Sequence, residues 1–174
     1  MGGMSKTPIR QALERLQMDG LVQIAPQQGI LVREVSLHEI NDVFDIRIAL
    51  ETFVLDRLAG RLVPDQEAAI REHLAQADRC VQAGDEVTYA ELDTAFHALW
   101  SEFLGNQEIV QVMRRNHDKL ARVILRVLRR DKDRLRTSHA DHVGIAEAVI
   151  IGDGALAGEC ILKHIEYAKR ILIS

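Results

Sequence analysis

The chain has 174 residues, of which 47% are hydrophobic, 28% are charged and only 3 are proline. This length and composition fit one helical domain of about 100–150 residues with a small attachment. No apolar run approaches the roughly 18 residues of a membrane-spanning helix, and no basic-then-apolar secretion signal opens the chain. Two isolated cysteines, Cys80 and Cys160, argue against a disulfide framework. We therefore expect a cytoplasmic protein with no membrane partner.

The charge is unevenly distributed along the chain. The net charge is −4 overall, yet the first 33 residues hold more basic than acidic side chains. They are Lys6, Arg10, Arg15 and Arg33 against Glu14 and Asp19. A basic head on an acidic body favours an anionic partner for the head alone.

Residues 1–33 predict one helix followed by a hairpin. Ser5 is a good N-cap for the helix, and Gly20 is a typical residue just beyond a helix C-terminus. Two short apolar runs, 21–24 and 30–32, then flank a turn that contains proline and glycine, as in a β-hairpin. This segment is too small to fold alone.

From Ser36 onward the pattern predicts helices only. Apolar residues recur at helical spacing between residues that are typical of helix ends. The expected helices span about 36–62, 64–84, 85–105, 106–130, 133–151 and 153–174. Short loops between such helices indicate an antiparallel bundle. The expected fold class is therefore all-α, an antiparallel bundle of about six helices after the N-terminal helix and hairpin.

The third bundle helix carries two candidate metal ligands. Asp93 and His97 are four residues apart, so their side chains leave the same face of the helix. Trp100 and Leu104 continue that row, and an apolar row adjoins it. The carboxylate and the imidazole therefore lie on or beside the stripe that should face the core.

Two further helices add inward histidines. The fifth offers His139 or His142, of which His142 is in line with Ile145, and the sixth offers His164 within an apolar row. A divalent metal would satisfy three imidazoles and a carboxylate that are costly to bury unpartnered. Such a set suits zinc, our first expectation, or nickel, manganese, cobalt or iron. Spacing alone leaves open a simple hydrogen-bonded pair of Asp93 with His97.

Arg47 lies on the inner stripe of the first bundle helix. A buried arginine needs an anion, which is either Glu51 one turn on or the carboxylate of a ligand. Three other histidines have less to suggest a site. His38 and His73 lie among polar residues and are expected at the surface, and His117 could support the metal ligands from the fourth helix.

The run Ser-Lys-Thr-Pro-Ile-Arg-Gln-Ala-Leu at residues 5–13, followed by Asp-Gly-Leu-Val at 19–22, resembles the recognition helix of the GntR family of bacterial regulators. Gly-Ile-Leu-Val at 29–32 is similar to the tip and second strand of that family's wing. The resemblance implies a winged helix-turn-helix that binds operator DNA. The residues that it places on DNA are Lys6, Thr7, Arg10 and Gly29.

The rest of the chain resembles the FadR-like subgroup with its FCD effector domain. The similarity rests on Arg47-Ile-Ala-Leu-Glu, on Asp93-x-x-Phe-His97, on His142-x-x-Ile-x-x-Ala-Val and on His164. It implies metal ligation by Asp93, His97, His142 and His164, which selects His142 over His139. It also implies a homodimer that binds a small organic acid near the metal, with Arg47 as a partner of the acid's carboxylate.

The head departs from the family pattern in one respect. Two helices precede the family's recognition helix, and residues 1–4 leave no room for them. We therefore expect 1–33 to be a remnant of the DNA-binding domain, 36–174 to be the effector domain, and this chain alone to bind DNA poorly.

Two other functions remain open from the residues. One is a metal-dependent hydrolase or isomerase, which would use the metal to activate water. Against it, no convincing general base lies beside the ligands, because Asp141 adjoins His142 but should point away from it. We expect no enzyme. The other is a dimerisation module without a ligand.

Overall fold

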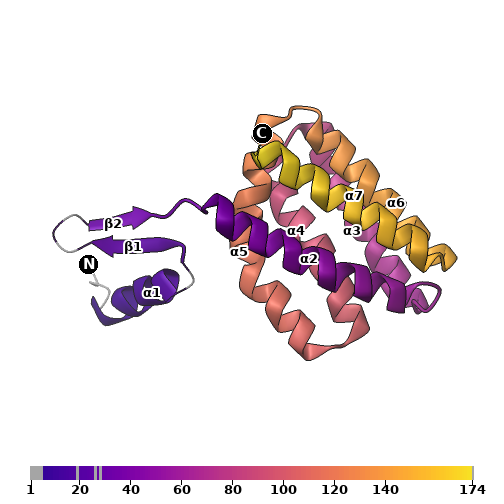
Figure 1. Cartoon of the computed structure of the whole chain (residues 1–174), viewed down its shortest axis with the longest axis horizontal. Helices are drawn as coiled ribbons and strands as arrows, with labels where there is room; N and C mark the ends of the chain where they lie inside the picture. The colour runs from indigo at the N-terminus through magenta and orange to yellow at the C-terminus, as the bar shows by residue number, and fades with distance from the viewer. Residues whose placement is uncertain (1–5, 19, 26, 28, 174) are drawn as a thin grey trace, which may run out of the picture. The chain divides into compact units, whose positions relative to one another are not determined.

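The structure is a computed structural model that describes residues 6–18, 20–25, 27 and 29–173. Contacts divide the chain into two units, Met1–Ser36 and Leu37–Ser174. The first contains helix α1 (Lys6–Met18) and the antiparallel strands β1 (Val22–Ala25) and β2 (Gly29–Val32) (Figure 1).

The first unit has the expected helix and hairpin. Gly20 follows α1 with a positive φ of 71°, and the amide of Leu21 donates to the Leu16 carbonyl at 2.9 Å, which ends the helix. Val22 pairs with Val32 across the hairpin, and Val22 is buried. The expected N-cap, Ser5, lies outside the described residues.

The second unit is the expected bundle of helices. Local end signals act as predicted: the Asn106 side chain accepts from the amides of Glu108 and Ile109, and Asp85 accepts from the amide of Thr88. The bundle helices are α2 (Leu37–Leu58), α3 (Pro64–Ala83), α4 (Glu86–Leu104), α5 (Gln107–Arg130), α6 (Arg134–Ile151) and α7 (Gly154–Ile173).

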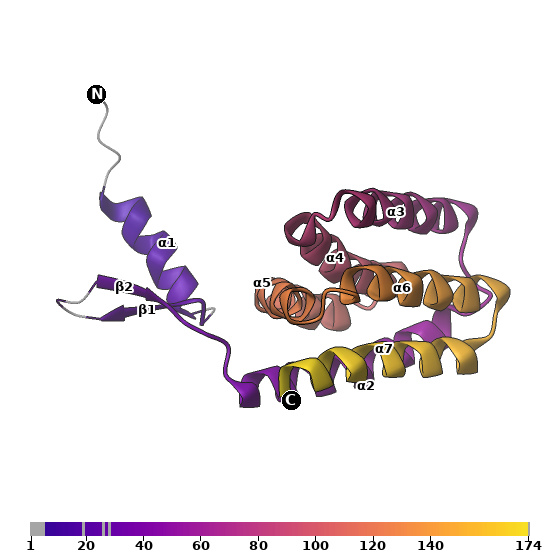
Figure 2. The ribbon, with the colours of Figure 1, turned by 90° about the horizontal axis from the view of Figure 1, so that it is seen from above.

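The bundle is arranged in layers around one core. Helices α2 and α7 lie side by side in one layer, α3 lies on the opposite side, and α4, α5 and α6 lie between them (Figure 2). Phe44, Tyr89, Phe96 and Trp100 are among the largest fully buried side chains. Three of these four aromatics belong to α4, which therefore runs through the interior.

Small residues let α2 and α7 approach closely. A Cβ atom added to Gly158 would lie 3.1 Å from Cγ2 of Thr52, and one added to Gly154 would lie 3.0 Å from Oδ1 of Asp56. The two helices run antiparallel, since Lys169 near the end of α7 pairs with Asp45 in the first half of α2. This packing brings the inner face of α7 toward the centre of the bundle.

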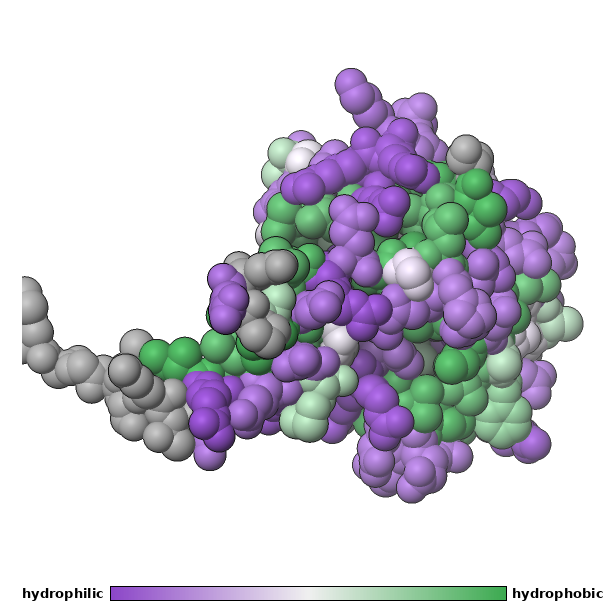
Figure 3. Space-filling view, turned by 60° about the vertical axis from the view of Figure 1, so that its left-hand side comes forward, coloured by the Kyte–Doolittle hydropathy of each residue, from purple (hydrophilic) through white to green (hydrophobic). Residues whose placement is uncertain are grey.

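The surface mixes polar and apolar side chains. Figure 3 shows one face on which hydrophilic and hydrophobic residues are interspersed. Ile46 and Phe53 of α2 are 41% and 46% exposed, and the guanidinium of Arg57 lies over the Phe53 ring. Among the described residues, no helix combines the length and apolar character needed to cross a bilayer.

Candidate metal centre

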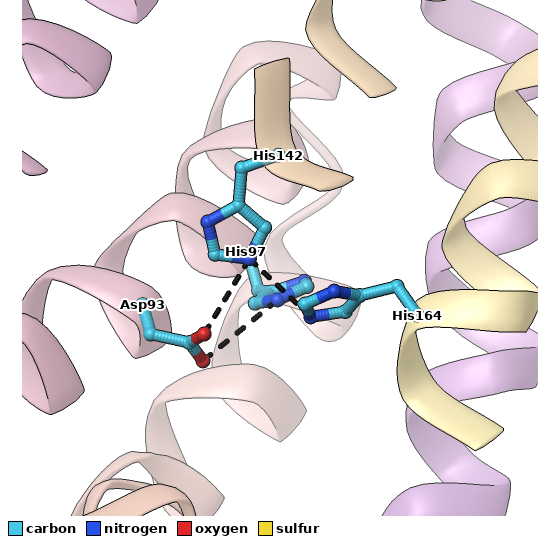
Figure 4. Close-up of side chains that lie close together, drawn as sticks. All are labelled: Asp93, His97, His142 and His164. Carbon is cyan, nitrogen blue, oxygen red and sulfur yellow. Dashed lines mark hydrogen bonds and ion pairs between the residues drawn. The ribbon is translucent and has the colours of Figure 1, made fainter. Parts of the chain in front are cut away.

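Four buried polar residues from three helices meet inside the bundle. Asp93 and His97 come from α4, His142 from α6 and His164 from α7. Each offers one ligand atom, and these atoms all lie within 4.8 Å of one another. Figure 4 shows the three imidazoles and the carboxylate turned toward a common centre. Each residue is at most 3% exposed, so the group is closed off from bulk water.

The distances within the group leave acceptor atoms without donors. Nε2 of His142 lies 3.3 Å from Nε2 of His164 and 3.4 Å from Oδ1 of Asp93. Nε2 of His97 lies 3.9 Å from Oδ2 of Asp93, and both of these buried atoms lack a hydrogen-bond partner in the described part of the chain. Unpartnered buried polar atoms are costly, and a cation between them would satisfy them together. The donor set of three imidazole nitrogens and one carboxylate oxygen suits a first-row transition metal.

The electrostatics keep two imidazoles neutral. Burial holds the pKa of His142 well below its usual 6.5, and electrostatic repulsion with the adjacent His164 would further disfavour its protonation. Burial also lowers the pKa of His164 to about 4, although its hydrogen bond to Asp141 opposes this shift. A neutral imidazole has a free lone pair, which is the form that binds a metal.

In two of the imidazoles, a carboxylate contacts Nδ1, the ring nitrogen that faces away from the centre. Oε2 of Glu51 lies 2.5 Å from Nδ1 of His97, and Oδ2 of Asp141 lies 3.0 Å from Nδ1 of His164. An Nδ1–H that donates to a carboxylate leaves Nε2 as the acceptor, so both rings present a lone pair to the centre. Ser138 Oγ donates to Oδ1 of Asp93 at 3.2 Å and holds that carboxylate in place.

Arg47 is buried beside this group, at 2% exposure. Its Nε donates to Oε1 of Glu51 at 2.7 Å, while its Nη2 has no hydrogen-bond partner among the described residues. Burial would raise the pKa of Glu51, but the charges and hydrogen bonds of Arg47 and His97 outweigh it and hold that pKa at about 2. The guanidinium of Arg47 therefore pairs with Glu51 through Nε and keeps Nη2 available for the carboxylate of a ligand.

A narrow pocket adjoins His97 on the side of α2 and α5. Its walls are mainly apolar and include Trp100, whose Nε1 is buried with no hydrogen-bond partner among the residues that the structure describes. The lining residues are Leu50, Glu51, Val54, His97, Trp100, Ser101, Ile109 and Met113. The space between these side chains is too small for a water molecule, so the pocket is a packing gap and not a formed ligand cavity.

The other four histidines do not belong to this group. His139 does not join the group, since its Nε2 lies 3.7 Å from Asp78 on α3. His38 is exposed as expected, but the surface position expected for His73 is wrong. His73 is 9% exposed because its Nε2 reaches the Leu92 carbonyl of α4 at 2.9 Å. His117 is 33% exposed beside Asp118 and shows no contact with the group.

Sequence reasoning missed the supporting residues. The sequence predicts Glu51 only as a partner of Arg47 and Asp141 only as a neighbour that points away from His142, whereas Glu51 also contacts His97. Asp141 does turn from His142, and it reaches His164 on α7 instead. Nothing in the sequence marks Arg134, yet its Nη1 donates to Oδ2 of Asp141 at 2.9 Å from a buried position.

The residues expected on DNA belong to the first unit. Lys6 and Thr7 lie in the first turn of α1, but their side chains are outside the described part of the structure. The Arg10 side chain is 82% exposed, and its Nε lies 3.1 Å from Glu14 one turn on. Gly29 begins β2 with a φ of 95°, a left-handed conformation that favours glycine at the hairpin turn.

Comparison with known proteins gives a family match over most of the bundle. The sequence model of the FCD domain matches residues 42–167. An uncharacterised HTH-type transcriptional regulator of Agrobacterium vitis is 35% identical over 98 residues, which cover 55% of this chain and 57% of the relative. The HTH-type transcriptional repressor RspR of Escherichia coli is 28% identical over 147 residues, which cover 84% of this chain and 59% of the repressor. The chain thus spans somewhat more than half the length of these two relatives.

Solved structures show the same fold at low sequence identity. A putative transcriptional regulator GntR from a Rhodococcus species has a TM-score of 0.84 at 20% identity, and the match covers 98% of this chain and 82% of that one. McbR/YncC of Escherichia coli has a TM-score of 0.83 at 18% identity, with 99% and 87% covered. Both matches extend over the N-terminal helix and hairpin as well as the bundle.

Proposed function

Because the chain belongs to the FCD-domain family of GntR-type transcription regulators, we propose that residues 36–174 form a metal-dependent sensor of a small organic acid. Asp93, His97, His142 and His164 would hold one divalent cation, with zinc as the first choice and nickel, manganese, cobalt or iron as the alternatives. The relatives are regulators and not enzymes, so we assign the centre a binding role and no catalytic residue.

The proposal depends above all on the unpartnered atoms at the centre. Oδ2 of Asp93 and Nε2 of His97 are fully buried, face each other and have no donor among the described residues. The carboxylates of Glu51 and Asp141 orient two of the imidazoles with their lone pairs inward, as is usual for histidines that bind metals. A bound cation supplies a Lewis-acid position that a ligand carboxylate can share.

The acid would bind between the metal and Arg47. Nη2 of Arg47 is a buried guanidinium donor without a partner in the described part of the chain, which supports an anionic group there. The pocket beside His97 and Trp100 is too tight for a water molecule, so the non-polar part of the acid would have to displace its lining side chains. Since an acid that contacts both the metal and Arg47 would bind the folded bundle alone, it would also stabilise that bundle.

The N-terminal unit would connect the sensor to DNA. In this proposal residues 1–33 belong to a winged helix-turn-helix, α1 contacts operator DNA through Lys6, Thr7 and Arg10, and Gly29 lies at the tip of the wing. The protein would act in the cytoplasm as a homodimer whose two heads respond to the acid.

Metal analysis of the purified chain tests the central claim. We expect about one equivalent of divalent metal in the wild type and none in His142→Ala, because loss of one ligand opens the site. His139→Ala is the matched control, since His139 lies one turn earlier on α6 and contacts Asp78 instead. Equal and negligible metal in all three proteins would refute the site. A dimerisation module without a ligand would also show no change in stability or oligomeric state on chelation.

A further inference from the structure

One carboxylate contacts both parts of the proposed sensor. Oε1 of Glu51 accepts from Nε of Arg47 at 2.7 Å, and Oε2 of the same side chain lies 2.5 Å from Nδ1 of His97. The two residues of α2 are a turn apart, whereas His97 comes from α4. Glu51 is 2% exposed, so no bulk water competes for either oxygen. Each oxygen is therefore committed to one of the two neighbours.

The geometry gives the two contacts different tasks. The Oε2 contact fixes Nδ1 of His97 as a donor and thereby leaves Nε2, 3.9 Å from Asp93, as the atom that can ligate. The Oε1 contact holds the carboxylate itself in place and leaves Nη2 of Arg47 as the free donor. A shift of the guanidinium toward an anion would disturb its hydrogen bond to the carboxylate that orients His97.

Asp141 provides a comparison within the same centre. It orients His164 in the way that Glu51 orients His97, with Oδ2 3.0 Å from Nδ1. Its own arginine partner, however, is Arg134, whose Nη1 lies 2.9 Å away, and not Arg47. The two carboxylates thus make the same kind of contact with a ligand histidine, but only Glu51 also contacts the arginine on the acid-binding side.

We propose that Glu51 is a positioning residue that couples Arg47 to the metal through His97. The acid that engages Arg47 then changes the affinity for the metal through Glu51, and by reciprocity the metal changes the affinity for the acid. This inference rests on the proposed metal site and adds to it the route by which the two binding events influence each other.

A double-mutant cycle with the metal alone tests the coupling. Zinc affinity is measured by competition with a chromogenic chelator for the wild type, Glu51→Gln, Arg47→Met and the double variant. We expect Glu51→Gln to weaken zinc binding about 10- to 100-fold, because the amide cannot accept on both sides. Arg47→Met should weaken zinc binding in the wild-type background. This loss of affinity should be at least about fivefold larger than the loss that Arg47→Met causes in the Glu51→Gln background. Any direct repulsion between Arg47 and the metal is the same in both backgrounds and cancels.

The matched cycle replaces Glu51→Gln by Asp141→Asn. This variant should also weaken zinc binding, but the effect of Arg47→Met should be the same with and without it, within about twofold. The visible absorption spectrum of the cobalt-loaded protein gives a second readout, since reorientation of His97 in Glu51→Gln should shift its bands. Arg47→Lys, which keeps a buried cation, replaces Arg47→Met if the latter does not fold.

The outcomes separate this inference from the proposed function. A wild type that binds no metal refutes the proposed site itself. A wild type that binds metal, with Glu51→Gln unchanged in affinity, refutes the positioning role. Equal effects of Arg47→Met in the wild-type and Glu51→Gln backgrounds refute the coupling, because Arg47 would then act on the metal by another route.

Discussion

Nη2 of Arg134 lies 2.9 Å from Nδ1 of His164, and the carboxylate of Asp141 lies 3.0 Å from the same nitrogen. An imidazole nitrogen can accept from the guanidinium or donate to the carboxylate, but it cannot do both. A metal on Nε2 requires a hydrogen on Nδ1, which selects the contact with Asp141. Metal binding should therefore fix the contact of His164 with Asp141, while Arg134 keeps its bond to Asp141.

The first prediction concerns Asp141. Asp141→Asn should lower the affinity for zinc about 10- to 100-fold, because the neutral amide no longer favours the Nδ1–H form of His164. Chelator competition measures the affinity. Asp45→Asn is the control, since Asp45 is 67% exposed and pairs with Lys169 on the surface. If the two variants bind zinc equally well, the orienting role of Asp141 is wrong.

The second prediction concerns Arg47 and the acid. In the metal-loaded protein, small mono- and dicarboxylates that bind should raise the melting temperature, since a ligand present at 100 times its Kd stabilises the folded state by about 2.7 kcal/mol. Arg47→Lys should reduce the shift, because an ammonium at the end of a flexible chain does not reproduce the planar fork. Thermal melting with a panel of acids measures it. A panel that shifts neither protein would count against an acid sensor.

Helix ends and the pair of Asp93 with His97 could be predicted from local spacing, whereas the choice of His142 over His139 came from the family resemblance. The expected helix 106–130 is observed as Gln107–Arg130, with the side chain of Asn106 as its cap. Asp93 and His97 share a face at any rotation of α4, since they are four residues apart. Which of His139 and His142 joins them depends on the rotation of α6, which spacing left open.

Contacts between helices could not be predicted in this way. Glu51 and His97 are 46 residues apart, and Asp141 and His164 are 23 apart. Whether such pairs meet depends on how α2, α4, α6 and α7 rotate and cross. The surface position predicted for His73 is wrong for the same reason. Its neighbours in the sequence are polar, but α4 covers it and supplies the Leu92 carbonyl.

The third prediction is a loss of stability of the metal-free protein on acidification. The pKa of His164 is about 4 in the fold, against 6.5 for a solvated histidine, so the unfolded chain binds more protons between these pH values. The free energy of unfolding should therefore fall as the pH drops from 6.5 toward 4, by roughly 3 kcal/mol for this residue. Glu51, with a pKa of about 2 against 4.5, should extend the loss below pH 4.5.

Urea unfolding at several pH values, with a chelator present, measures this dependence. His164→Gln should have a shallower pH dependence between 6.5 and 4, because it removes one of the groups that resist protonation. His38→Gln is the control and should keep the wild-type slope, since the His38 side chain is 86% exposed. A wild-type stability that does not change across this range would contradict the neutral, buried state of His164.

The fourth prediction concerns the contact of α2 with α7, which carries His164 into the bundle. Gly158→Val should lower the free energy of unfolding by about 1–3 kcal/mol, because a Cβ there already approaches Cγ2 of Thr52 to 3.1 Å and two methyl groups must follow it. Gly144→Ala is the matched control within a helix. No atom lies within 4 Å of a Cβ added at Gly144, so this change should stabilise the protein by about 0.5–1 kcal/mol.

Urea unfolding of the two variants compares these effects directly. If Gly158 matters for the approach of the helices, Gly158→Val should also weaken zinc binding, because α7 would be pushed away from α2 together with His164. Gly144→Ala should leave zinc binding unchanged, since nothing packs against that position. Equal stabilities of the two glycine variants would mean that the helices tolerate a wider spacing than the structure shows. The close approach of α2 and α7 would then not be what sets the position of His164.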